Sequence, residues 1–136
     1  MPLVRISMRQ GHPAEYRRSV ADAVHRTLVE TINVPEADRF QVITEHAPGD
    51  LIIDRKYLGI ERSDDALLVQ VTLSAGRPVE AKKRLYARMA ELLKASVGLR
   101  PDDLFVNLVE VTPADWSFGK GIAQYAASDS PAPPPR

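Results

Sequence analysis

The chain has 136 residues, of which 44% are hydrophobic and 26% are charged, as in ordinary globular proteins. Basic and acidic residues both number 18, so the zero net charge offers no long-range attraction to nucleic acid or an anionic membrane. Cysteine is absent, which excludes disulfides and thiolate chemistry, and the three histidines form no metal-ligand pattern. The sequence shows neither a signal peptide nor a membrane-spanning stretch, so we expect a cytoplasmic protein without a cofactor.

The first third of the chain alternates strand and helix signals. Residues 2–8 alternate in polarity and predict a strand. Pro13 follows a turn and suits the first position of a helix, which we expect over residues 14–32. One apolar stripe supports this helix: Val20, Val24, Leu28 and Ile32. Residues 40–44 (Phe-Gln-Val-Ile-Thr) predict a second strand.

The same signals return after a connector. In residues 46–65, turn residues surround the apolar run Leu51-Ile52-Ile53, for which we expect a short strand or hairpin. Residues 66–73 are almost continuously apolar, as in a strand buried on both faces. A second amphipathic helix should follow and end at Gly98, and residues 104–111 predict the last long strand.

The two halves superimpose without a gap when one is shifted by 65 residues. Apolar positions, turn residues and charged residues coincide. The matched pairs include Val4 with Val69, Ile6 with Val71, Gly11 with Gly76, Pro13 with Pro78, Asp38 with Asp103 and Phe40 with Phe105. We therefore expect one domain, residues 1–127, made of two β-α-β units at about residues 2–46 and 67–111.

This repeat predicts an α+β fold. Each unit should place its two strands in parallel, and two units side by side give a four-stranded sheet with both helices on one face. Strand positions facing the other way also include apolar residues, so another subunit is expected to cover that face. The Pro-rich tail at residues 128–136 is expected to be disordered.

Pro2 breaks the symmetry of the repeat, because its counterpart Leu67 is internal. Removal of Met1 would expose a secondary amine on Pro2. A free α-amine has a pKa of about 7.7–8.0, which apolar surroundings or a cation lower and a carboxylate raises. The amine is a candidate general base, or a general acid if it stays protonated. The alternative is that proline is merely tolerated here.

Four further residues are candidates for a site around Pro2. Arg77 lies in the turn into the second helix, where a guanidinium and a helix N-terminus can hold a carboxylate. Asp38 lies in a polar loop and could polarise water or a substrate carbonyl. Trp116 and Phe118 could form an apolar wall. The structural alternatives are a surface arginine, a turn-capping aspartate, and core or intersubunit aromatics.

Together these features resemble the tautomerase superfamily and, within it, the malonate semialdehyde decarboxylase branch. The resemblance rests on the start Met-Pro-Leu-Val and on residues 34–41 (VPEADRFQ), 45–50 (EHAPGD), 100–103 (RPDD) and 115–119 (DWSFG). It implies a trimer of this duplicated fold with Pro2 as the catalytic group. By the same resemblance Asp38 is the loop aspartate, Arg77 an active-site arginine, and Trp116 and Phe118 the aromatic wall.

The resemblance also implies an enzyme acting on a small carboxylate. The decarboxylase branch carries two arginines separated by one residue at this turn, whereas this chain has Ala75 and Arg77. One arginine can hold a 2-oxo or enol acid for proton transfer, so we expect keto–enol tautomerisation with Pro2 as the proton carrier. Two alternatives stay open: decarboxylation of a 3-oxo acid with hydratase activity, and a non-catalytic trimeric binding module. Neither nucleic acid nor a membrane is expected as a partner.

Overall fold

The computed structural model describes residues 1–126, so the predicted disordered tail lies outside the described residues. The main elements are β1 (Leu3–Arg9), α1 (Ala14–Ile32), β2 (Gln41–His46), β3 (Leu67–Ser74), α2 (Val79–Val97) and β4 (Leu104–Val111). The predicted helices and long strands are confirmed, with ends shifted by at most two residues. No helix within the described range has both the length and the apolarity that crossing a membrane requires.

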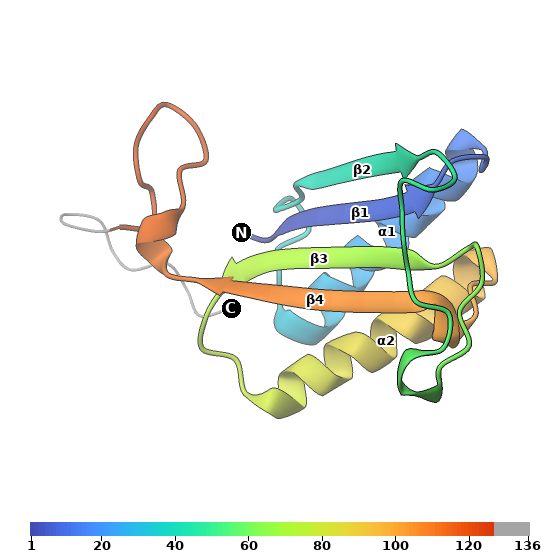
Figure 1. Cartoon of the computed structure of the whole chain (residues 1–136). Coiled ribbons are helices and arrows are strands. Elements are labelled where there is room, and N and C mark those ends of the chain that lie inside the picture. Colours follow the sequence, from blue (N-terminus) through green and yellow to red (C-terminus); the bar gives the residue numbers. More distant parts are fainter. Residues whose placement is uncertain (127–136) are drawn as a thin grey trace.

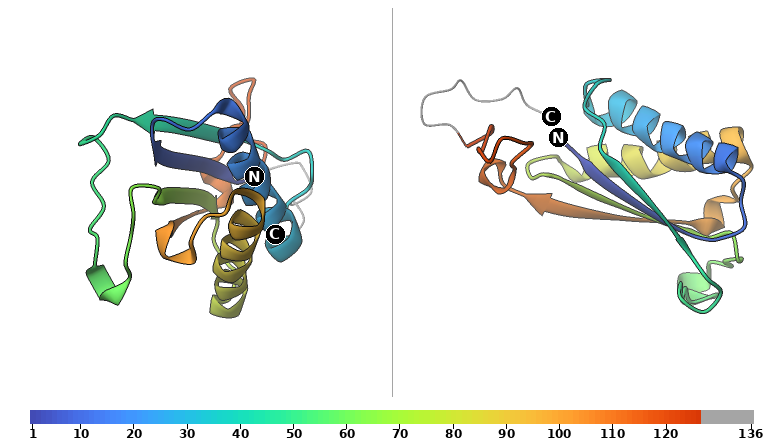
Figure 2. Two further views of the ribbon diagram at one scale, coloured as in Figure 1. Left: turned by 90° about the vertical axis from the view of Figure 1, so that its right-hand side faces the viewer. Right: turned by 90° about the horizontal axis from the view of Figure 1, so that it is seen from above.

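The four strands form one mixed sheet in the order β2-β1-β3-β4. Each β-α-β unit pairs its own strands in parallel, β1 with β2 and β3 with β4, and the two units meet through the antiparallel pair β1–β3. Both helices lie side by side on one face of the sheet (Figures 1 and 2). This is the predicted α+β arrangement.

The repeat extends to the ends of the helices. Pro13 precedes α1 with φ −69° and ψ 162°, and Pro78 precedes α2 with φ −70° and ψ 160°. Asn33 ends α1 at φ 57° and Gly98 ends α2 at φ 69°, the left-handed conformation that asparagine and glycine adopt most readily. Equivalent turns therefore deliver both strands and both helices in the same way.

The core lies between the helices and the sheet. Alternate side chains of β1 and β3 face the helices and are at most 1% exposed: Val4, Ile6, Met8, Leu67, Val69, Val71 and Leu73. They pack against helix side chains such as Val24, Leu28, Leu85, Met89 and Leu93. Each fully buried side chain of this kind contributes about 1.5–3 kcal/mol to folding. The rigid layer fixes the strand ends from which the site is built.

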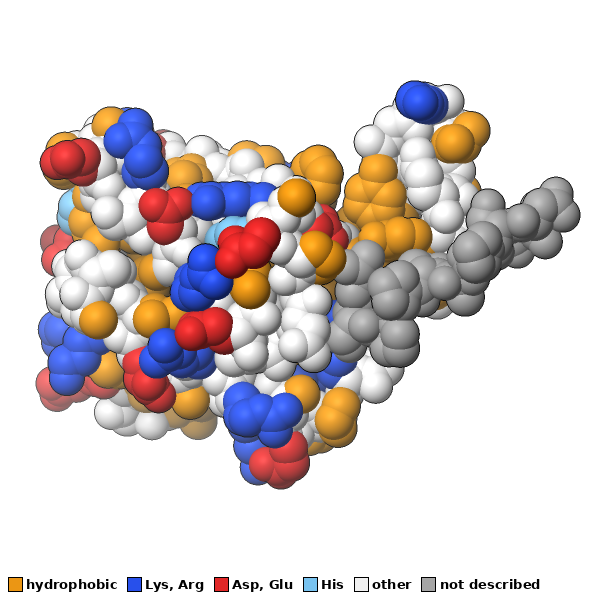
Figure 3. All heavy atoms as spheres, turned by 180° about the vertical axis from the view of Figure 1, so that it is seen from behind, with side chains coloured by type: hydrophobic (Ala, Val, Ile, Leu, Met, Phe, Trp, Pro, Cys, Tyr) orange, Lys and Arg blue, Asp and Glu red, His pale blue; other side chains and the backbone are white. Residues whose placement is uncertain are grey.

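The opposite face of the sheet has no helix over it within residues 1–126 (Figure 2). Register places Val42, Leu68, Phe105 and Val109 on this face, which we call the open face. Phe105 is 48% exposed and Val42 is 41% exposed. Seen from the helix side, the molecule instead shows acidic and basic side chains interspersed (Figure 3). The open face therefore exposes apolar side chains, with the exposed polar residues Arg5, Gln70 and Asn107 among them.

The predicted short strand or hairpin in residues 46–65 is wrong. Beyond the end of β2 this connector contains only one helical turn, Tyr57–Gly59, and it stands away from the sheet (Figure 2). Residues 47–66 pair with no strand of the sheet, and the side chain of Ile52 in the apolar run is 88% exposed. The Asp54 carboxylate instead accepts hydrogen bonds from the backbone of Lys56 and Tyr57, at 2.8 and 2.7 Å. Such local bonds compete with strand pairing.

Candidate active site

The amino terminus lies at the end of the sheet where β3 and β4 finish (Figure 1). Pro2 is buried directly before β1, and Met1 is only 2% exposed. The Met1 amine forms an ion pair with the Asp38 carboxylate, whose side chain is 13% exposed. A buried ammonium group needs such a partner, because an unpaired buried charge is strongly unfavourable.

Parallel pairing explains why Asp38 lies beside the terminus. The backbone N–H of Val4 donates to the carbonyl of Phe40 at 3.0 Å, which aligns the start of β1 with the loop that enters β2. Within that loop the Asp38 N–H donates to the Pro35 carbonyl at 3.0 Å. The topology of one β-α-β unit thus brings its loop aspartate to its own first residue.

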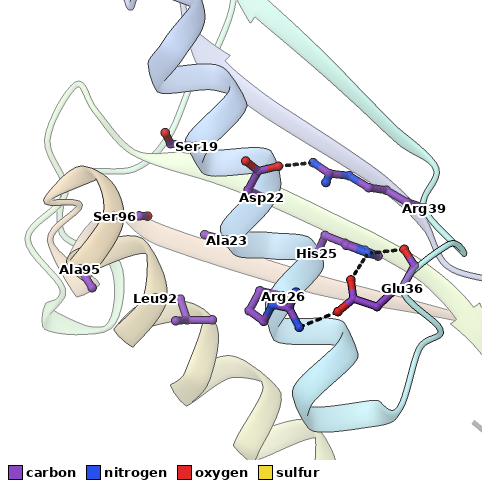
Figure 4. A pocket seen from close by; sticks show the side chains of 10 residues that line it. All are labelled: Ser19, Asp22, Ala23, His25, Arg26, Glu36, Arg39, Leu92, Ala95 and Ser96. Atoms are coloured by element: carbon purple, nitrogen blue, oxygen red, sulfur yellow. Dashed lines mark hydrogen bonds and ion pairs between the residues drawn. The ribbon is translucent and has the colours of Figure 1, made fainter.

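The outer side of this loop is fixed to α1 (Figure 4). The buried His25 donates from Nε2 to the Glu36 carbonyl at 2.9 Å, since a carbonyl can only accept. Arg26 pairs with the Glu36 carboxylate at 2.8 Å, and Arg39 pairs with Asp22 at 2.7 Å. These side chains line an open groove of about 630 Å³ between the helices. Because its charged groups are paired with one another, we interpret the groove as a support for the loop.

The second unit contributes the end of β3 and the turn that follows. Antiparallel pairing with β1 carries the end of β3 past the amino terminus. The Ser74 hydroxyl donates to Met1 Sδ at 2.6 Å, and the Ser74 carbonyl accepts a hydrogen bond from Arg77 Nη1 at 2.9 Å. Arg77 is half-buried. The guanidinium and the terminal residue thus contact the same serine.

The carboxy-terminal arm, residues 112–126, adds the aromatic side chains. Trp116 Nε1 donates to Ser74 Oγ at 3.3 Å. Trp116 and Phe118 stack with ring centroids 5.4 Å apart and an interplanar angle of 9°. The ring of Phe118 also meets the ring of Tyr125 edge-on, with centroids 4.9 Å apart. Its centroid lies 6.1 Å from that of Phe40, which follows Asp38 in the loop before β2. The aromatic chain therefore links the arm to both β-α-β units.

Two carboxylates near the second turn and the arm have lowered pKa values. A hydrogen bond from Lys82 lowers the pKa of Glu110, with further contributions from the backbone of Gly76 and the charge of Arg77. Hydrogen bonds from the backbone and hydroxyl of Thr112 lower the pKa of Asp115, which closes the first turn of the arm. Within residues 1–126, no three His, Asp or Glu side chains gather closely enough to hold a metal ion.

All five residues proposed from the sequence contribute to this end of the molecule. Met1 joins Pro2 to Asp38, and Ser74 joins Met1 to Arg77 and Trp116, with Phe118 stacked beyond. Sequence reasoning missed Ser74 and Phe40. Both lie within three residues of a predicted site residue, but neither has a chemical signature of its own. The catalytic roles stay predictions.

Comparison with known proteins identifies the family. A family model for tautomerase enzymes matches residues 38–119, more than half of the chain, and another matches residues 2–60. The chain belongs to the tautomerase family. The probable tautomerases YusQ and YrdN of Bacillus subtilis (strain 168) are 37% and 38% identical to it. These alignments cover 91% and 92% of this chain and 98% and 96% of the relatives.

Solved structures support the predicted branch. The malonate semialdehyde decarboxylase FG41, inhibited by 3-bromopropiolate, is 43% identical with a TM-score of 0.85, covering 90% of this chain and 93% of that one. A second malonate semialdehyde decarboxylase, for which decarboxylase and hydratase activities are described, is 36% identical with a TM-score of 0.84 over 89% and 93% of the chains. It was also solved with its proline at position 1 replaced by alanine. The predicted superfamily and branch are confirmed, and this tautomerase is an enzyme.

We expect the His25→Ala variant to loosen the Asp38 loop. Loss of the donor to the Glu36 carbonyl should lower the free energy of unfolding by about 1–3 kcal/mol. It should also speed amide hydrogen exchange in residues 33–40. Arg26→Ala is the matched control, because its side chain is 47% exposed and its pair with Glu36 should be worth less than about 1 kcal/mol. Equal losses in the two variants would contradict this interpretation.

Proposed function

We propose that Met1 is removed from this tautomerase and that the Pro2 amine then transfers a proton on a small 2-oxo or enol acid. The observation that supports a functional amine is the ion pair between the buried terminal amine and Asp38, whereas the preference for tautomerisation rests on the single arginine, Arg77, of the turn after β3. Removal of one residue would leave the Pro2 nitrogen as the terminal amine at the same end of the sheet. The relative studied with its first proline replaced by alanine supports the same assignment.

The proposed reaction is keto–enol tautomerisation. The neutral Pro2 nitrogen accepts a proton from the carbon next to the 2-oxo group, and the electron pair of that C–H bond moves toward the carbonyl oxygen. The protonated amine then delivers a proton to that oxygen, which gives the enol and restores Pro2. Arg77 holds the substrate carboxylate by charge-assisted hydrogen bonds. Asp38 stabilises the protonated amine and polarises substrate or water.

The aromatic wall has a supporting role in this proposal. Trp116 and Phe118 exclude water from the space beside Ser74, which strengthens the attraction between Arg77 and a carboxylate. Exposed Ala75 occupies the position where the decarboxylase branch carries its first arginine. A single guanidinium can bind the substrate carboxylate, which tautomerisation requires, whereas decarboxylation must also expel it. We therefore propose tautomerisation as the first candidate reaction.

Two observations favour decarboxylation of a 3-oxo acid as the second candidate. The two similar solved decarboxylases are 43% and 36% identical to this chain. In addition, a carboxylate beside a terminal amine favours the protonated form of that amine. A protonated amine acts as a general acid rather than as a base. In this reaction the C–C bond to the carboxylate breaks and carbon dioxide leaves, while the electron pair moves toward the 3-oxo oxygen, to which protonated Pro2 donates a hydrogen bond. The resulting enolate takes a proton from Pro2 at carbon, and Pro2 regains a proton from solvent. Asp38 would position substrate or activate water. Hydration of an activated alkyne acid would use the same groups.

A kinetic screen of 2-oxo and 3-oxo acids tests these proposals. Pro2→Ala should lower kcat by about 10²- to 10⁴-fold, the usual contribution of general acid–base catalysis. Arg77→Ala should raise KM by about 10- to 100-fold because a charge-assisted contact to the carboxylate is lost. Arg84→Ala is the matched control, since Arg84 is exposed on α2. Its kinetics should equal those of the unaltered enzyme.

The pH profile separates the two reactions. Turnover that rises as a near-neutral group loses its proton supports the base mechanism, whereas turnover that requires the protonated group supports decarboxylation. If Pro2→Ala leaves every activity unchanged, the catalytic assignment of Pro2 fails and the binding-module alternative gains support.

We also propose that the chain assembles as a homotrimer through the open face. The exposure of Phe105, Val42 and Val109 on this face supports the proposal, because apolar side chains gathered on one layer favour burial by another subunit. The fused 4-OT called Q0, which is 28% identical with a TM-score of 0.73 over 88% of this chain and 94% of that one, was solved as a symmetric trimer.

Light scattering tests the trimer. Phe105→Glu should dissociate it by burying a charge in the interface. Val79→Glu is the matched control, because Val79 is 62% exposed in the first turn of α2, outside the open face. A mass that is unchanged in Phe105→Glu, or equally reduced in both variants, would contradict an interface on the open face.

A further inference from the structure

Met1 occupies the centre of the candidate site. Its side chain is 3% exposed, its amine contacts Asp38 and its sulfur contacts Ser74. On the proposed function, on which this inference rests, Met1 is absent from the active enzyme. Its removal exchanges a buried residue for an open volume directly in front of the Pro2 nitrogen. The contacts of Met1 therefore report which protein groups face that volume.

Ser74 is the polar group that faces it from β3. Its hydroxyl has two neighbours, Trp116 Nε1 at 3.3 Å and Met1 Sδ at 2.6 Å. An indole N–H only donates, so the Ser74 oxygen accepts from Trp116 and its proton points at the methionine sulfur. Thioether sulfur is a weak acceptor. Trp116 thus keeps the Ser74 proton directed away from its indole N–H and available to the residue in front of Pro2, and loss of Met1 takes away the acceptor of that hydrogen bond.

The same serine is joined to the proposed carboxylate-binding residue. Its carbonyl accepts a hydrogen bond from Arg77 Nη1 at 2.9 Å, so the guanidinium and the hydroxyl are held by one residue at the end of β3. A carboxylate has two oxygens and can accept from both donors at once. The neutral Ser74 hydroxyl could thus give the carboxylate a second hydrogen bond beside that of Arg77, whereas the methyl side chain of Ala75 can give none.

We infer that Ser74 is a substrate-binding residue, whose hydroxyl donates a hydrogen bond to a carboxylate oxygen of the substrate in the volume that Met1 fills. Trp116 acts as a positioning residue by orienting this hydroxyl.

Binding and turnover are measured together to test the inference, with pyruvate and malonate as probes in the processed protein. Ser74→Ala should weaken binding of at least one probe by about 10- to 100-fold, as expected for loss of a hydrogen bond to a charged group. In turnover this should be seen mainly as a higher KM. Ser74→Thr keeps a hydroxyl and should restore much of the affinity. Trp116→Phe keeps the stacked ring but loses the N–H, and should give a smaller loss.

Ser117→Ala is the matched control, because Ser117 is exposed in the same arm beside Trp116. Its probe affinity should be unchanged. Thermal unfolding of each variant separates loss of fold from loss of binding, and Trp116→Phe keeps the test decisive if Ser74→Ala is unstable. Unchanged affinity in folded Ser74→Ala and in Trp116→Phe, or no binding of either probe to the unaltered protein, would overturn the inference.

The Pro2→Ala protein distinguishes this inference from the proposed function. It should lose turnover but still bind the probes through Ser74, so that Pro2→Ala combined with Ser74→Ala binds about 10- to 100-fold more weakly than Pro2→Ala alone. If Pro2→Ala retains full turnover, the proposed role of Pro2 fails, and the affinity ratio still decides the role of Ser74.

Discussion

The buried ion pair between the terminal amine and Asp38 is the interaction on which the candidate site depends. A charge at the end of a buried strand requires a partner of opposite sign, and the parallel pairing of β1 with β2 delivers one from the loop that enters β2. Two contacts fix that loop to α1: the hydrogen bond of His25 to the Glu36 carbonyl and the ion pair of Arg39 with Asp22. Catalysis at the terminus would therefore depend on the β1–β2 pairing and on the contacts of His25 and Arg39, none of which touches the reacting atoms.

The two halves of the fold use equivalent positions differently. Asp103 is the counterpart of Asp38, but it is 2% exposed and accepts hydrogen bonds from the backbone and hydroxyl of Ser63, at 2.7 and 2.6 Å. In the second unit, Ser63 of the connector thus occupies the aspartate, Asp103. In the first unit, the equivalent aspartate, Asp38, pairs with the terminal amine. A chain terminus exists only once, so one unit supplies the amine and the aspartate while the other supplies Ser74 and Arg77.

Much of the fold followed from the sequence because the repeat gives two independent readings of each element. The apolar stripe and turn chemistry of α1 recur in α2, and both helices were predicted correctly. The connector has no counterpart in the repeat, and the local bonds of Asp54 outweighed its apolar run. Periodicity carries no information on such side chain–backbone competition.

Only part of the candidate site could be predicted from the sequence, because some of its contacts form only in the folded chain. Pro2, Asp38, Arg77, Trp116 and Phe118 were singled out by residue type and by resemblance to a family. Ser74 is an ordinary strand-end serine whose proposed role rests on three contacts that exist only after folding, those with Met1, Arg77 and Trp116. Its chemistry is common, and its position is what distinguishes it.

Covalent labelling of the amino terminus is the most direct test of the central claim that Pro2 is the reacting amine. 3-Bromopropiolate, which inhibits the similar decarboxylase FG41, is the suitable probe. Mass spectrometry of the digested protein should yield an amino-terminal peptide that begins at Pro2 and carries one adduct on its nitrogen. A peptide that begins with Met1, or an adduct elsewhere with an unmodified Pro2, would contradict the claim.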